Sequence, residues 1–98
     1  MEYRLLKIVK SDVEGKKYMA IFVNKATKRE KTIHFGASGY SDYTIHKDEE
    51  RKQRYIARHK ANEHWNDPMT SGSLSRYILW NKPTLSESIK DYKTRFNL

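Results

Sequence analysis

The sequence contains no cysteine and no long apolar run. Without cysteine the chain forms no disulfide and offers no thiolate to a metal, which fits an intracellular protein. No apolar stretch approaches the roughly 18 residues that a membrane-spanning helix needs. The N-terminal segment lacks the apolar core and small-residue cleavage site of a signal peptide; it reads MEYRLLKIVKSD. We therefore expect neither secretion nor a membrane partner.

Signatures of known catalytic sites are missing as well. The sequence has no nucleophile elbow, no phosphate-binding glycine loop and no zinc-protease histidine pair. His59 and His64 are five residues apart, which is about 140° around one helix and unsuited to joint metal ligation. Convergence of three histidines with Asp42 is the alternative, but we expect no metal and no cofactor.

Positive charge is what the sequence has in excess. Lysine and arginine number 20 against 12 aspartates and glutamates, which gives a formal net charge of +8. The first 60 residues hold 15 of these basic residues and 8 of the acidic ones, whereas the remainder is close to neutral. Such a balance favours anionic partners, nucleic acid among them, although surface lysines also serve solubility alone.

Hydrophobic patterning predicts a three-stranded antiparallel meander in the first third of the chain. Residues 1–10 are apolar and basic, and the Asp and Gly of residues 11–15 suit a hairpin turn. Residues 17–23 are apolar on both faces, which is typical of a central strand covered on both sides. After a polar turn at 24–29, residues 31–35 alternate again.

The rest of the chain predicts a loop and about three helices. Residues 36–45 are rich in Gly and Ser and indicate a loop. Residues 47–62 are helix formers with acids first and bases last, an order that complements the helix dipole. A short helix follows within 71–80, with Ser71 or Ser73 as its cap.

The last helix carries the strongest local signal. TLSE, at residues 84–87, is a capping box, and an apolar face follows at spacings of four, three and four. This face consists of Leu85, Ile89, Tyr92 and Phe96. The whole chain, 1–98, is therefore expected to be a single small basic α+β domain in which one helix covers the sheet.

A basic ridge is predicted on the helix at 47–62. It consists of Lys47, Arg51, Arg54 and Arg58, at spacings of four, three and four. Such a ridge suits contacts with phosphates. The simpler alternative is a solvated face, because Glu50 and Arg54 form a favourable i,i+4 pair on the same helix.

Two further features support binding of nucleic acid, DNA or RNA. Lys28 and Arg29 lie among other lysines in the turn after the second strand, and Tyr40 and Tyr43 can stack on bases if their rings are exposed. The alternative for the tyrosines is a place in the core. The first hypothesis is thus a non-enzymatic protein that binds nucleic acid mainly through phosphates, with low sequence specificity.

Two other hypotheses remain open. Trp65, Tyr77 and Trp80 are residue types that anchor protein interfaces, which suggests a virion structural or assembly protein with a viral or host partner; packing in the core explains them equally well. A small nuclease or hydrolase would place its chemistry at Asp42, His46 and His59. The simpler interpretation of the nearby carboxylates, Asp48, Glu49 and Glu50, is that they form surface ion pairs with the basic residues that follow them.

The sequence also resembles a known protein family. The resemblance runs from Ile33 to Phe96 and rests on two segments, HFGASGYSDYTIHKDEERKQRYIARH and NDPMTSGSLSRYILWNKPTLSESIKDYKTRF. The family comprises small uncharacterised proteins encoded by large double-stranded DNA viruses of algae and protists, with related sequences in other microbial eukaryotes. The resemblance implies a non-enzymatic viral protein inside the host cell, in cytoplasm or nucleus or packaged in the virion. It assigns no role to any individual residue.

Overall fold

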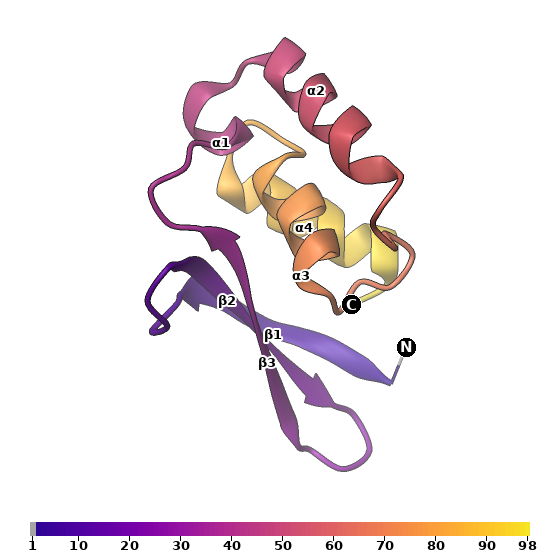
Figure 1. The fold of residues 1–98 in the computed structure, drawn as a ribbon. Helices are drawn as coiled ribbons and strands as arrows, with labels where there is room; N and C mark the ends of the chain where they lie inside the picture. The colour runs from indigo at the N-terminus through magenta and orange to yellow at the C-terminus, as the bar shows by residue number, and fades with distance from the viewer. Residues whose placement is uncertain (1) are drawn as a thin grey trace.

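An antiparallel sheet of three strands opens the fold in the computed structural model, which describes residues 2–98. The strands are β1 (Tyr3–Lys10), β2 (Lys16–Asn24) and β3 (Glu30–Ala37), and they lie in sequence order with β2 in the centre. The predicted meander is therefore confirmed. Figure 1 shows the sheet below a group of helices formed by the second half of the chain.

Local chemistry explains both hairpin turns. Gly15 ends the first turn with φ +88°, a conformation that costs a glycine little. In the second turn the side-chain oxygen of Asn24 accepts hydrogen bonds from the backbone N–H groups of Ala26 and Thr27, both at 2.9 Å. The β1–β2 ladder skips Leu6, which leaves this bulged residue 42% exposed.

Five helical segments follow the sheet. They are α1 (Tyr43–His46), α2 (Glu49–Lys60), α3 (Ser71–Leu74), the π-helical turn η1 (Ser75–Leu79) and α4 (Leu85–Phe96). The helix α1 lies in the segment predicted as loop, so the loop ends earlier than its Gly and Ser content indicates. Within residues 2–98, no helix is both long enough and apolar enough to cross a membrane.

Side-chain caps fix where the later helices begin. Thr70, rather than Ser71 or Ser73, caps α3: its hydroxyl accepts from the N–H of Ser73 at 3.1 Å. Thr84 caps α4 as predicted, accepting from the N–H of Glu87 at 3.3 Å. The Thr84 hydroxyl also donates to the Glu87 carboxylate at 2.8 Å, so the two side chains of the capping box contact each other directly.

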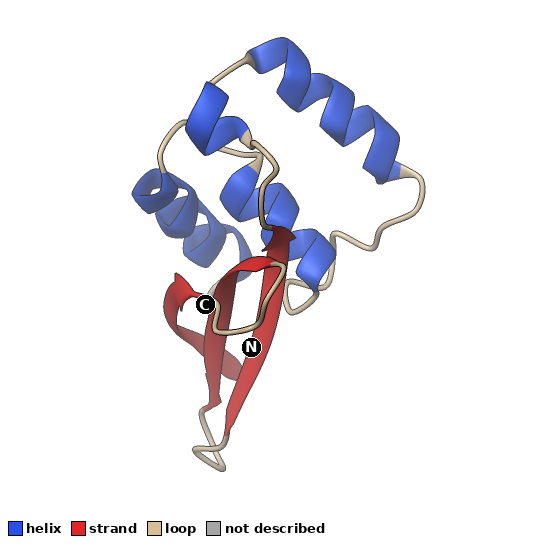
Figure 2. Cartoon of the chain, turned by 60° about the vertical axis from the view of Figure 1, so that its left-hand side comes forward, coloured by secondary structure: helices blue, strands red, loops and turns tan. Residues whose placement is uncertain are grey.

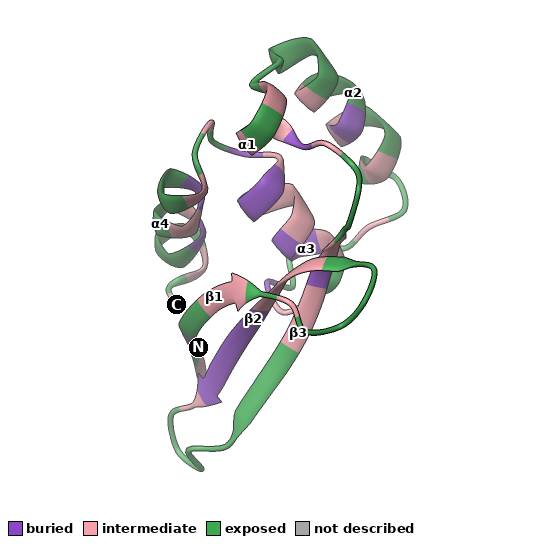
Figure 3. Cartoon of the chain, turned by 90° about the vertical axis from the view of Figure 1, so that its left-hand side faces the viewer, coloured by how far each residue is buried: buried purple, intermediate pink, exposed green. Residues whose placement is uncertain are grey.

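The core lies between one face of the sheet and the helical segment α3–η1–α4. Ala20, Phe22 and Phe35 are fully buried on the sheet side. From the helices, the buried members of the same cluster are Leu74, Ile78, Leu79 and Tyr92. Figure 3 shows the buried residues gathered on β2 and on the helical segment above it.

The fourth helix contributes to this core as its pattern predicts. Tyr92 is completely buried and donates its hydroxyl to the carbonyl of Pro68 at 2.5 Å, while Leu85, Ile89 and Phe96 pack around the cluster. Burial raises the pKa of the Tyr92 hydroxyl, which therefore stays a donor. Figure 2 shows all helices at one end of the sheet, with the β2–β3 turn projecting from the other end.

Gly36 provides a test of the packing between β3 and η1. A Cβ at this position would lie 2.8 Å from Leu79 Cδ1 and 3.2 Å from Lys17 Cβ, and φ is +78°. Gly39 has a similar φ of +84° but open space around it. We expect Gly39→Ala to lower the free energy of unfolding by about 1–2 kcal/mol through the left-handed backbone alone.

Gly36→Ala adds a steric clash and should cost about 1–3 kcal/mol more than Gly39→Ala. Urea unfolding of the two variants and the wild type measures this difference directly. Equal losses in the two variants would mean that Leu79 and Lys17 yield freely, and that β3 is not tightly packed on η1.

Candidate functional site

A cleft of about 540 Å³ opens between α2 and the helix-bearing end of the sheet. Its walls come from segments far apart in the sequence, and they include Lys16, Lys17, Tyr40, Arg51, Arg58 and Trp80. The antiparallel register forms the sheet side of the cleft, because it pairs Lys16 with Ala37 and so places the loop after β3 beside the start of β2. We refer to this space as the cleft.

A stack of aromatic rings holds α2 over the cleft. Tyr55 is the only buried residue within Glu49–Lys60. Its ring lies parallel to that of Trp80, with centroids 4.4 Å apart and an interplanar angle of 3°, and its other face meets His59 at 4.3 Å. Burial raises the pKa of the Tyr55 hydroxyl. The ring of His46 packs against Trp80 at a tilt of 55°, with centroids 5.3 Å apart.

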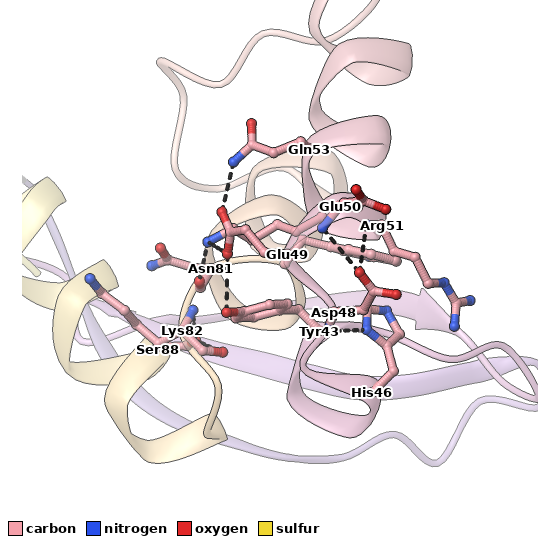
Figure 4. Close-up of polar contacts among 12 residues, drawn as sticks. Tyr43, His46, Asp48, Glu49, Glu50, Arg51, Gln53, Asn81, Lys82 and Ser88 are labelled. Carbon is pink, nitrogen blue, oxygen red and sulfur yellow. Dashed lines mark hydrogen bonds and ion pairs between the residues drawn. The ribbon is translucent and has the colours of Figure 1, made fainter.

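A tight corner between α1 and α2 orients the helix (Figure 4). Asp48 caps α2 by accepting from the backbone N–H groups of Glu50 at 3.0 Å and Arg51 at 3.3 Å. The N–H of Asp48 in turn donates to His46 Nδ1 at 2.9 Å. Between them Lys47 adopts a left-handed conformation with φ +55°, which ends α1. The direction of α2 is therefore set before its first turn.

Further polar contacts fasten α2 to its neighbours, and Figure 4 shows part of this network. The hydroxyl of Tyr43 donates to Glu49 at 3.2 Å, and Lys52 donates to the carbonyl of Asn81 at 3.1 Å. The Lys52 ammonium also lies 4.5 Å from the centre of the Tyr43 ring. One face of Tyr43 is thus covered within the chain.

Both carboxylates that line the cleft have partners inside the protein. Asp42 is 2% exposed; it pairs with Lys17 at 2.5 Å and accepts from the N–H of Thr44 at 2.9 Å. Glu63 accepts from His59 Nδ1 at 3.0 Å through one oxygen and from Trp65 Nε1 at 2.6 Å through the other. Asp42 is thus paired with the Lys17 ammonium, whereas Glu63 is held by hydrogen bonds that orient its carboxylate towards His59 and Trp65.

Three cations of the cleft lack such a partner. Within residues 2–98, no carboxylate lies within 4.0 Å of the side-chain nitrogens of Lys16, Arg51 or Arg58. Lys16 belongs to the sheet wall, and Arg51 and Arg58 belong to α2. The cleft therefore presents positive charge from two opposing walls, an arrangement suited to an anion held between them.

The predicted position of Lys47 on the basic ridge is wrong. Lys47 precedes α2, because the chain turns from α1 into α2 at this left-handed residue. Its ammonium donates to the Thr44 carbonyl at 3.0 Å. Arg51 and Arg58 line the cleft. Arg54 does not, and it reaches towards Glu50 at 3.9 Å, as the solvated-face alternative describes.

The other predicted nucleic-acid residues are separated from one another. Lys28 and Arg29 lie in the β2–β3 turn, at the end of the molecule opposite to α2 (Figure 1), along a longest dimension of 42 Å. Tyr40 is 74% exposed and lines the cleft with Arg51. Tyr43 is half-buried under Lys52, so only Tyr40 of the two tyrosines offers an uncovered ring.

The residues predicted for a protein interface make contacts within the chain. Trp80 stacks on Tyr55, Trp65 donates to Glu63, and Tyr77 meets the ring of Phe96 at 5.3 Å. All three predicted residues are partly buried. These contacts match the packing alternative, and an interface role for their remaining surface stays a prediction.

The histidines and Asp42 do not form a metal-binding cluster in the part of the chain that the structure describes. There, no group of three or more His, Asp or Glu residues lies close enough to hold a metal ion. Asp42 and His59 both line the cleft, but Asp42 is bound to Lys17 and His59 is bound to Glu63. His46 packs against Trp80.

Sequence reasoning missed Lys16, Lys17 and Glu63 as cleft residues. The position of the two lysines could have been predicted from the sequence. In an antiparallel meander, the start of the second strand lies beside the end of the third. Applied to Lys16, this rule puts a basic pair next to the loop that carries Tyr40. No sequence signal distinguishes Glu63, whose position depends on the turn after α2.

The stack on Trp80 gives a prediction about stability. We expect Trp80→Ala to lower the free energy of unfolding by about 3 kcal/mol, because it removes the ring on which Tyr55 packs and leaves a cavity. Trp65→Ala, which removes a tryptophan outside the stack, should cost clearly less. Chemical denaturation of both variants tests this; an equal or smaller loss for Trp80→Ala would show that α2 is held by other contacts.

His46 gives a prediction about pH. Burial and then the charge of Arg51 lower its pKa, and within residues 2–98 its Nε2 is buried without a hydrogen-bond partner. The unfolded chain therefore binds the proton more readily, so stability is lost as the pH falls below about 6.5. Urea unfolding between neutral and mildly acidic pH should show a smaller loss in His46→Phe than in the wild type. If the stability of His46→Phe and of the wild type fell equally with pH, the prediction would be contradicted.

Comparison with known proteins identifies a family without assigning a function. The model of a family of unknown function, DUF5754, matches residues 6–59, which is more than half of the chain. This match includes most of β1 and all of β2, where the expected resemblance did not reach, and it ends before the tryptophan-rich segment. No curated protein and no solved structure matches the chain. The chain belongs to the DUF5754 family of unknown function.

Proposed function

We propose that this is a non-enzymatic protein that binds nucleic acid mainly through backbone phosphates held in the cleft. The observation that carries the proposal is a set of three cations on two opposing walls, Lys16, Arg51 and Arg58, which have no acidic partner among residues 2–98. In complexes with nucleic acids, lysine and arginine side chains mostly contact the phosphates of the backbone.

Low sequence specificity follows from the same groups. An ammonium or guanidinium that contacts a phosphate fixes the position of the strand and does not read the base edges. Lys28 and Arg29 extend the proposal, because they offer a second contact point at the far end of the 42 Å molecule. The net charge of +8 would support association with a polyanion over the whole surface.

The resemblance to viral proteins adds proposals about the setting of the protein. It supports a viral origin and a site of action in the cytoplasm or nucleus of the host, with packaging in the virion as a further possibility. An assembly role through Trp65, Tyr77 and Trp80 receives less support, since each of these side chains already contacts other residues of the chain.

The proposal is tested by fluorescence anisotropy with labelled DNA and RNA across a range of salt concentrations. We expect the double variant Arg51→Ala/Arg58→Ala to bind more weakly and to reduce the log–log salt slope by about 0.7–0.9 per lost phosphate contact.

A charge-matched control is Arg54→Ala/Lys60→Ala, which removes two cations from the same helix outside the cleft. We expect this control variant to retain most of the wild-type affinity for nucleic acid. Equal weakening in both double variants would mean that net charge, and not the cleft, determines binding. Absence of binding by the wild type at low salt would refute the proposed function altogether.

A further inference from the structure

The cleft suits a thin ligand. Its volume of about 540 Å³ falls within the range of roughly 300–1,000 Å³ typical of pockets that enclose small ligands. One or two nucleotides fit into such a space, whereas a duplex presents its phosphates on the outside of a broad, stiff rod. We therefore expect a duplex to contact Arg51 and Arg58 only from the mouth of the cleft.

The positions of the cations also favour a strand that passes through the cleft. Arg51 and Arg58 are seven residues apart on α2, so they lie on nearly the same side and about 10 Å apart along the helix axis. Lys16 belongs to the opposite wall. A flexible backbone between these walls meets positive charge on both sides, and the two arginines can contact separate phosphates.

Tyr40 supplies a stacking surface at the same site. Its ring is 74% exposed, whereas Tyr55 has both faces covered by Trp80 and His59. A turn fixes its position: the N–H of Tyr40 donates to the Ala37 carbonyl at 3.4 Å, across Gly39 with φ +84°. An exposed aromatic ring beside cations is the usual combination for binding an unpaired base and its phosphate.

We infer that the cleft binds single-stranded nucleic acid, with Lys16, Arg51 and Arg58 on its backbone phosphates and Tyr40 stacked on a base. This inference rests on the proposed function and names its ligand class. Only a single strand offers both a backbone narrow enough for the cleft and an unpaired base for the Tyr40 ring. Base stacking tolerates every base, so the inference is consistent with low sequence specificity.

The test compares three labelled probes of matched length and sequence: single-stranded DNA, single-stranded RNA and the DNA duplex. Anisotropy titrations at low salt should show single strands binding at least about tenfold more tightly than the duplex. Tyr40→Ala should weaken single-strand binding at least about fivefold, the lower end of what a lost base stack costs, and leave duplex binding unchanged. Tyr40→Phe retains the aromatic ring and should therefore still bind single strands more tightly than the duplex.

Ile45→Ala is the matched control, because Ile45 is a large apolar residue, 63% exposed, that does not line the cleft. Circular dichroism confirms that each variant is folded before titration. Equal affinity for all three probes, with sensitivity to Arg51→Ala/Arg58→Ala, would overturn the single-strand inference and leave the proposed function standing. No binding of any probe would overturn both.

Discussion

The contact between Tyr55 and Trp80 determines whether the cleft exists. The helix α2 is predominantly charged and buries only Tyr55, so it has little apolar surface with which to pack on the rest of the chain. The parallel rings supply that surface, and they join a residue of α2 to one that follows η1. Without this contact the sheet and α4 would keep their own core, but α2 would be held only by the corner at Asp48 and by its polar contacts.

The residues that line the cleft explain how a chain with 12 acidic residues presents a cationic surface there. Lysine and arginine contribute Lys16, Lys17, Arg51 and Arg58, whereas the acids contribute only Asp42 and Glu63. Lys17 pairs with Asp42, and Glu63 is turned towards His59 and Trp65. The excess of cations therefore comes from the lining, and the pairing leaves Lys16, Arg51 and Arg58 available to a ligand.

Much of the fold follows from the sequence, whereas the site follows only in part. The two-sided apolar pattern of 17–23 predicts the central strand, and TLSE predicts the start of α4, because both signals are local. The place of Lys47 depends on a left-handed turn between two helices, for which non-glycine residues give little warning. That Arg51 faces a cleft and Arg54 does not depends on how α2 docks, a tertiary contact that helical spacing alone does not contain.

The shallow attachment of α2 has a consequence for the dynamics of the protein. Segments with few buried contacts open locally at a lower free energy than the global core. Backbone amides of α2 are therefore expected to exchange with solvent deuterium faster than those of β2, whose residues from Ala20 to Val23 are all buried. Local opening of α2 would separate Tyr55 from Trp80 and change the width of the cleft. A molecule bound between the walls would then slow amide exchange in this helix even if it touched only side chains.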